Sequence, residues 1–113
     1  MWMIVGAQRF AVTLEDNPTA RAMQQLLPIT LDMEELNGNE KHAALPLNLP
    51  TRGARPGTIR AGDVLLYGDN TLVVFYKTFA SSYVYTRIGR IEGSTGLASA
   101  LSPGNQRVTF TIR

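Results

Sequence analysis

Two continuous apolar runs in the middle of the chain constrain the fold more than any other feature of the sequence. They occupy residues 64–67 and 72–76, and a Gly-Asp-Asn-Thr segment at 68–71 joins them. A strand with one face in water alternates apolar and polar side chains, whereas a strand covered on both faces is apolar throughout. We therefore predict a central hairpin whose two strands are buried on both faces.

Segments on either side of this hairpin alternate instead, as half-buried strands do. The alternation covers residues 9–15, 29–36 and 107–113, and shorter strands are expected at 2–5 and 40–45. The apolar side chains that we expect to point inward are Phe10, Val12, Leu14, Ile29, Leu31, Met33, Val108, Phe110 and Ile112.

A further strand is predicted at residues 83–91, where two tyrosines begin the segment. Strict alternation would place Tyr83, Tyr85, Arg87 and Ile91 on one face, with Ile88 on the other. Gly89 interrupts this strand, and a glycine at such a position indicates a bulge or a close approach of two backbones. We expect this irregularity where a barrel closes.

Two short helices are also predicted. Asn17 can cap the first, Pro18 suits its first position, and Pro28 ends it because proline lacks the amide that the next turn needs. The second helix is expected at residues 96–101, with Ser94 or Thr95 as its cap and Pro103-Gly104 at its end.

These elements add up to seven or eight strands and two helices in 113 residues, which is the size of one domain. We predict an all-β fold, a closed antiparallel eight-stranded barrel with a short helix covering each open end, as a single domain over residues 1–113. Residues 46–62 are rich in proline and glycine and show little periodicity. This composition predicts a long surface loop, and such loops can form one wall of a binding groove.

Composition excludes several classes of function. The absence of cysteine rules out disulfides, thiolate catalysis and cysteine-based zinc sites. A net charge of +2, with the arginines scattered along the chain, argues against nucleic acid as a partner. We find no signal peptide at the N-terminus and no apolar run long enough to span a bilayer, so we expect a cytoplasmic protein without membrane contact.

The chain offers little for catalysis or metal binding. His42 is the only histidine, and a role as general base would require a nucleophile such as Ser81 or Ser82 and a carboxylate to orient the ring. No motif ties these residues together, and no second histidine or carboxylate cluster accompanies His42. We therefore predict no catalytic residues, no metal site and no cofactor.

Several motifs resemble a known family. The segment Ile88-Gly89-Arg90-Ile91-Glu92-Gly93, followed by a helix and a last strand, resembles a Phe-Gly-Lys-Val-Lys-Glu-Gly region of cyclophilins. The chain is more similar still to the small bacterial cyclophilin-like family, often left as a domain of unknown function, and this resemblance covers essentially residues 3–113. It rests on four pieces: Leu27-Pro28-Ile29-Thr30-Leu31, residues 36–41, Gly62-Asp63 with Leu66-Tyr67-Gly68, and residues 75–76 through 83–91.

The resemblance implies a closed eight-stranded barrel with helical caps, but the cyclophilin catalytic motifs are missing. Cyclophilins carry a Phe-His-Arg strand motif, whose arginine is taken to stabilise the twisted prolyl amide, and a Phe-Met-Gln-Gly-Gly-Asp segment. The corresponding strand here reads Leu31-Asp32-Met33-Glu34, without arginine. Losing the electrostatic stabiliser of a transition state costs orders of magnitude in rate. The resemblance therefore leaves enzymatic activity open and favours its absence.

We expect a domain that binds a peptide or small ligand without chemistry. Aromatic side chains supply apolar contact area, and tyrosine adds a polar handle. The alternatives are a weak peptidyl-prolyl isomerase, with Arg52 or Arg55 replacing the missing arginine, and rings that merely fill the barrel. The candidate ligand-binding residues are Phe75, Tyr76, Tyr83, Tyr85, Arg52 and Asn39.

Self-association is the third possibility. If a strand at residues 2–5 lies at a sheet edge with Trp2 exposed, dimers are expected, because unprotected edges pair with other chains. We therefore expect a monomer or a weak homodimer.

Overall fold

The computed structural model describes residues 1–102 and 104–113 and contains ten strands and two helices among them. Pro103, which was predicted to end the second helix, lies outside the described residues. The elements are β1 Trp2–Val5, β2 Gln8–Leu14, α1 Pro18–Gln24, β3 Ile29–Leu36, β4 Glu40–Ala44, β5 Gly57–Ile59, β6 Asp63–Tyr67, β7 Thr71–Phe75, β8 Phe79–Ser81, β9 Tyr85–Ile91, α2 Leu97–Leu101 and β10 Gln106–Thr111.

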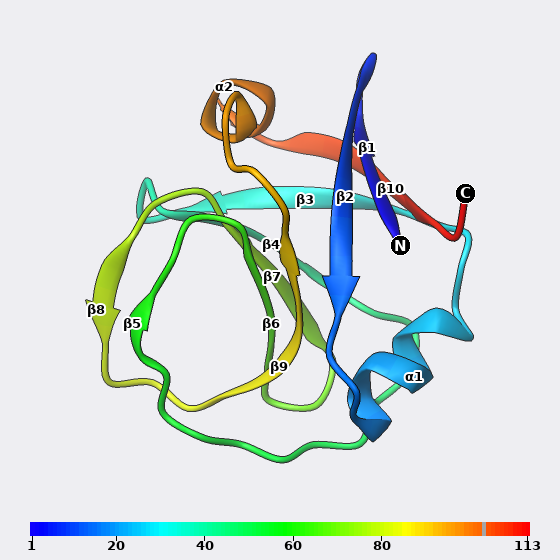
Figure 1. The fold of residues 1–113 in the computed structure, drawn as a ribbon, viewed down its shortest axis with the longest axis vertical. Helices are drawn as coiled ribbons and strands as arrows, with labels where there is room; N and C mark the ends of the chain where they lie inside the picture. Colours follow the sequence, from blue (N-terminus) through cyan, green and yellow to red (C-terminus); the bar gives the residue numbers. More distant parts are fainter. Residues whose placement is uncertain (103) are drawn as a thin grey trace.

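Eight of these strands close into an antiparallel barrel in the order β1-β10-β3-β4-β7-β6-β9-β2. Figure 1 shows the barrel, and the predicted all-β class and closure are confirmed. The predicted total of seven or eight strands was too low, because β5 and β8 form a separate two-stranded sheet. Strand β5 lies inside the segment 46–62, which we had predicted to be loop throughout.

The central hairpin β6–β7 is buried on both faces, as the two apolar runs predict. Val64, Leu66, Leu72 and Val74 belong to the core cluster inside the barrel. On the other face, Leu65, Val73 and Phe75 join a second, smaller cluster outside the barrel wall. This outer cluster also contains Ile59, Tyr85 and Phe79, which come from β5, β9 and β8.

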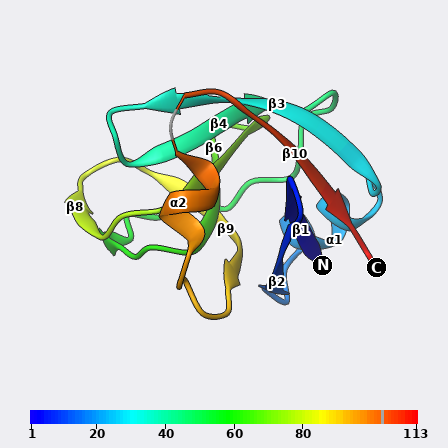
Figure 2. The ribbon, with the colours of Figure 1, turned by 90° about the horizontal axis from the view of Figure 1, so that it is seen from above.

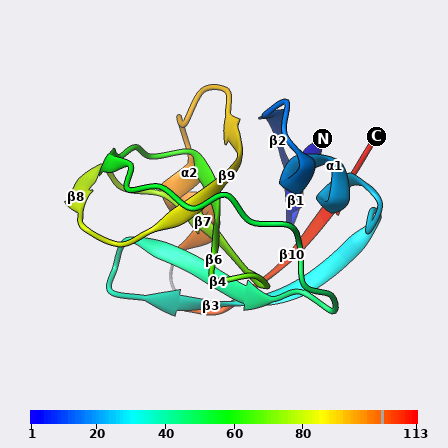
Figure 3. The same cartoon turned by 90° about the horizontal axis from the view of Figure 1, so that it is seen from below.

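The small sheet β5–β8 therefore acts as a second layer over part of the barrel. Figure 2 and Figure 3 show it on the side of the molecule away from helix α1 and the two termini. Ile59 of β5 is fully buried and Phe79 of β8 partly so, in contact with the outer face of the central hairpin. Without this cover, the outer apolar side chains of β6 and β7 would face water.

A bulge in β9 lies at the predicted irregularity. Val64 of β6 pairs with Gly89 and Leu65 pairs with Arg87, so Ile88 is the extra residue. Because of this shift, Ile88 and Ile91 both point into the barrel core, and our assignment of the two to opposite faces was wrong. A Cβ atom on Gly89 would lie 2.5 Å from the backbone oxygen of Thr13, so the glycine also allows the close approach of β2 and β9.

The condition for edge-to-edge pairing at residues 2–5 is not met. Strand β1 pairs with β2 on one side and with β10 on the other, because the barrel is closed. The Trp2 ring lies under the guanidinium of Arg9, 4.6 Å from ring centroid to Cζ. The prediction for Ile112 was also wrong, since β10 ends at Thr111 and the Ile112 side chain is exposed.

Both helices insert apolar side chains into the barrel core, Met23 from α1 and Leu97 and Leu101 from α2. Asn17 caps α1 as predicted, because its side chain accepts a hydrogen bond from the Ala20 amide at 2.7 Å. The predicted Ser94 or Thr95 cap of α2 was wrong. Gly96 occupies that position with a φ of 79°, and no side chain caps the helix.

No helix in residues 1–102 and 104–113 is long and apolar enough to cross a membrane. The same residues contain no group of three or more histidine, cysteine, aspartate or glutamate side chains placed to hold a metal ion.

Gly89→Ala is expected to lower the free energy of unfolding by about 1–3 kcal/mol, because the added methyl group forces β2 and β9 apart where the barrel closes. Urea denaturation measures the loss. Thr13→Ala is the control in the same strand pair, since it removes only an exposed hydrogen bond to Glu92 and should cost well under about 1 kcal/mol. Equal stabilities for the two variants would contradict the tight approach.

Candidate functional site

Three hollows adjoin one another on the outer face of the barrel, and Tyr85 lines all of them. The arginine hollow, of about 490 Å³, includes Arg52, Arg55, Leu65, Thr86 and Arg87. The central hollow, of about 760 Å³, includes Thr51, Tyr67, Tyr83, Val84 and Thr86. The aromatic hollow, of about 480 Å³, includes Asn39, Glu40, His42, Val73 and the rings of Tyr67, Phe79 and Tyr83.

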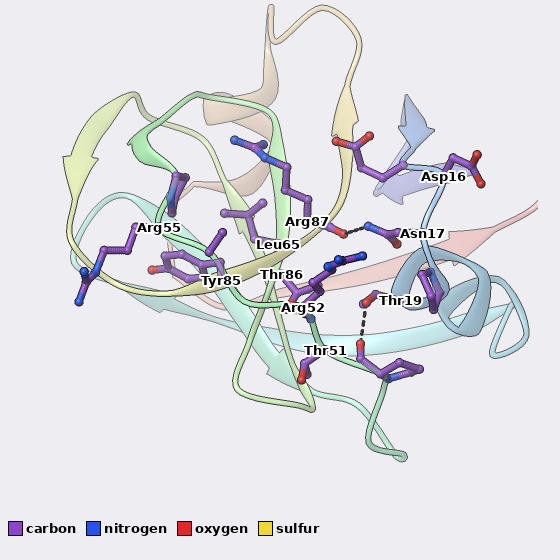
Figure 4. A pocket seen from close by; sticks show the side chains of 15 residues that line it. Asp16, Asn17, Thr19, Thr51, Arg52, Arg55, Leu65, Tyr85, Thr86 and Arg87 are labelled. Atoms are coloured by element: carbon purple, nitrogen blue, oxygen red, sulfur yellow. Dashed lines mark hydrogen bonds between the residues drawn. The ribbon is translucent and has the colours of Figure 1, made fainter.

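The arginine hollow lies between helix α1, the long loop and β9. Figure 4 shows the three arginine side chains pointing in different directions around Leu65, Tyr85 and Thr86. The Arg55 Nε atom donates a hydrogen bond to the Ser82 carbonyl at 3.1 Å. Because the guanidinium groups diverge, they do not converge on one anion.

Hydrogen bonds hold the walls of this hollow in place (Figure 4). Asn17 donates from its amide nitrogen to the Arg87 carbonyl at 2.8 Å, and Thr19 donates to the Pro50 carbonyl at 2.6 Å. The long loop is paired to β9 through two backbone hydrogen bonds between Ala54 and Tyr85, at 2.9 and 3.0 Å. The loop predicted to wall a groove therefore lies against the strand that carries Tyr85.

The aromatic rings form a connected set beside the central and aromatic hollows. Tyr67 makes edge-to-face contacts with Tyr83 and Tyr85, with ring centroids 6.2 and 5.7 Å apart. Phe75 contacts Tyr85 and Phe79 from below, at 5.6 and 5.7 Å. Such contacts add about 0.5–1.5 kcal/mol beyond the area buried, so the rings hold one another in fixed orientations.

Glu40 places a carboxylate in this aromatic setting. It pairs with Phe75 across β4 and β7, on the strand face that points out of the barrel, and its residue is only 6% exposed. Burial raises the pKa of Glu40, and the negative charge of Glu35 adds to the effect. Burial also raises the pKa of the Tyr85 hydroxyl, again with a contribution from the charge of Glu40.

Four of the six candidate residues gather around the aromatic hollow. Asn39, Tyr83 and Tyr85 line it, and Phe75 lies fully buried beneath Tyr85 and Phe79. Tyr83 is 62% exposed, and it lies just before β9 instead of within it. Arg52 is separate from these residues and lines the arginine hollow, where its backbone amide donates to the Thr86 hydroxyl at 3.1 Å.

Tyr76 lies elsewhere, with the barrel core cluster. Its hydroxyl donates to Glu35 Oε1 at 2.6 Å, and burial together with this bond raises the pKa of Tyr76 to about 12. The fully buried Lys41 donates to the same carboxylate at 2.8 Å and to the Gly104 carbonyl. These bonds lower the pKa of Glu35 although burial opposes the shift. Tyr76 thus belongs to an internal polar network and faces none of the three hollows.

Tyr67, Phe79 and Glu40 were not among the site residues predicted from the sequence. Tyr67 could have been found, because it is two residues beyond Leu65 and shares the outward face of β6. Glu40 gave no such signal. Its burial depends on the pairing of β4 with β7, which sets Glu40 opposite Phe75.

Residues 3–113 match the sequence model of the cyclophilin-like family. The chain belongs to the cyclophilin-like family. Neither the comparison with curated proteins nor that with solved structures produced a match. The family resemblance expected from the sequence motifs is thereby confirmed.

Strand β3, where the resemblance led us to look for the cyclophilin arginine, carries no arginine. His42 lines the aromatic hollow, whereas Ser82 lines the central one. Within the part of the chain that the structure describes, no hydrogen bond joins His42 to Ser81 or Ser82. The described residues therefore contain no hydrogen-bonded histidine–serine pair of the kind that a histidine-based mechanism uses.

Phe75→Ala is expected to reduce the free energy of unfolding by about 3–5 kcal/mol, because the fully buried ring is central to the outer cluster. Tyr83→Ala should change it by about 1 kcal/mol or less, because that ring is mostly in water and loses only its edge contact with Tyr67. Urea denaturation of both variants makes the comparison. A tolerated Phe75→Ala would mean that this ring is a replaceable pocket wall instead of core.

Proposed function

We propose that this cyclophilin-like domain is a non-catalytic binding module that holds a peptide or small ligand in the hollows around Tyr85. The observation that carries the proposal is the exposure of two tyrosines beside a buried third. Tyr83 and Tyr67 are 62% and 48% exposed, while Tyr85 between the three hollows is buried.

The chemistry of the hollows fits such a role. Ligand sites are concave, measure about 300–1,000 Å³ and combine aromatic walls with a few polar groups. The aromatic hollow supplies four rings together with Asn39, Glu40 and His42. Aromatic side chains lose little conformational entropy on binding, particularly where neighbouring rings already fix them.

The adjoining hollows also suit a ligand longer than a single side chain. Tyr67 and Tyr83 line both the aromatic and the central hollow, and Thr51 and Thr86 line both the central and the arginine hollow. An extended peptide could thus contact aromatic groups at one end and arginines at the other. The backbone pairing of Ala54 with Tyr85 keeps the loop wall in place for it.

Tyr83→Ala is expected to weaken ligand binding about fivefold, since one aromatic contact contributes about 1 kcal/mol. Ligand-observed NMR against a library of proline-containing peptides and metabolites measures the affinities. Leu47→Ala is the control, because Leu47 is similarly exposed at 60% and lines none of the three hollows. An equal loss in the two variants, or a library without binders, would contradict the proposal.

A weak prolyl isomerase is the second candidate, and one observation favours testing it. Arg52 and Arg55 line the same hollow as Tyr85, so a guanidinium and an aromatic ring lie within one site. The divergence of the arginines and the bond from Arg55 to Ser82 argue against a preorganised electrostatic stabiliser.

A protease-coupled assay on a proline peptide decides between the two candidates. We expect the isomerisation rate to equal that of buffer, and Arg52→Ala and Arg55→Ala to leave it unchanged. An acceleration that Arg52→Ala or Arg55→Ala removes would make the domain an enzyme.

A further inference from the structure

Glu40 is a mostly buried charged residue on the outer face of the barrel. The residue is only 6% exposed, and it lines the aromatic hollow. Among the described residues, its carboxylate has neither a hydrogen-bond donor nor an ion-pair partner. In the described part of the chain, only Asp63 Oδ1 is a fully buried side-chain oxygen without a hydrogen bond, so the Glu40 oxygens still reach the open space of the hollow. A carboxylate with so little access to water is destabilised unless it is paired.

The nearest basic side chain along the chain does not compensate Glu40. Lys41 points to the other face of β4, into the barrel, where its ammonium is bound to Glu35 and to the Gly104 carbonyl. His42 shares the outward face with Glu40 and lines the same hollow, but no hydrogen bond or ion pair joins these two described side chains. The carboxylate is thus left for a group that enters the hollow.

The remaining walls of the hollow suit a positive charge. Tyr67, Phe79, Tyr83 and Tyr85 all line it. The planes of Tyr83 and Tyr85 are turned by 81° and 61° relative to Tyr67, so these rings meet edge to face instead of stacking. Rings arranged around a space attract cations through their electron-rich faces, as aromatic cages for ammonium groups do.

We propose that the aromatic hollow binds an organic ammonium group, with Glu40 as its counter-ion and the tyrosine rings as its walls. This ammonium site rests on the proposed binding function and specifies the charge of what this part of the groove accepts. The ammonium can belong to a small molecule or to a basic side chain of a bound peptide. A cation with an apolar body matches both the carboxylate and the rings, whereas a hydrated metal ion would leave the rings unused.

The unpaired carboxylate also predicts a cost in stability. Burial raises the pKa of Glu40, which means that the ionised form is disfavoured in the folded protein without a ligand. Glu40→Gln keeps the shape and removes the charge. This variant should therefore unfold at a higher temperature than the wild type at neutral pH, as often happens when a functional charge is removed.

The test uses two probes of nearly the same shape, choline and its neutral analogue 3,3-dimethylbutanol. Protein-observed NMR titrations at millimolar concentrations measure the affinities of both for the full chain. The wild type should bind choline about tenfold or more tightly than the alcohol. Glu40→Gln should lower choline affinity by about tenfold or more and leave the affinity for the alcohol unchanged.

Different outcomes distinguish the ammonium site from the proposed function. Equal binding of choline and the alcohol would overturn the preference for a cation and leave the groove as an apolar binding site. Failure of choline to bind would overturn the ammonium site, while peptide binding that depends on Tyr83 would still support the module. The wild-type comparison does not depend on the folding of any variant. Lysine-containing and norleucine-containing versions of one peptide then distinguish a peptide source from a small molecule.

Discussion

The burial of both faces of the central hairpin is the constraint on which the rest of this structure depends. One set of side chains from β6 and β7 fills the barrel, and the other set faces outward. Exposing Leu65, Val73 and Phe75 to water would lose about 1.5–3 kcal/mol for each side chain. The chain covers them with the small sheet β5–β8 and with Tyr85, and the three hollows adjoin this cover. The framework of the barrel and the walls of the candidate site are thus made partly of the same residues.

Much of the fold follows from the sequence for physical reasons. Alternation in β2, β3 and β10 and continuous apolarity in β6 and β7 report directly which faces are buried. Gly89 inside a strand-like segment indicated an irregularity, and the structure has both a bulge of β9 against β6 and a close approach of Gly89 to Thr13 of β2. The helix caps illustrate the limit. Asn17 has a side chain that can cap, whereas α2 begins at a left-handed glycine that no capping rule for serine or threonine anticipates.

The site was harder to predict than the fold, because it depends on register. The adjacent residues Phe75 and Tyr76 show how a shift of one position changes the surroundings of an aromatic ring. Phe75 faces the outer cluster, while the Tyr76 hydroxyl is bound to Glu35 in the internal polar network. The burial of Glu40 follows only from its pairing with Phe75, which no local pattern contains. The free sheet edge considered at Trp2 is likewise absent, because closure of the barrel pairs β1 on both sides.

The outer face around Tyr85 is the place where we propose that this cyclophilin-like domain meets its ligand. Amide chemical-shift mapping on the isotope-labelled wild type tests that claim most directly, because it locates binding without assuming the ligand's chemistry. With any ligand that binds, the largest shifts should fall in residues 39–42 and 83–87. Shifts concentrated instead on β1, β2 and β10, away from the three hollows, would contradict the proposal.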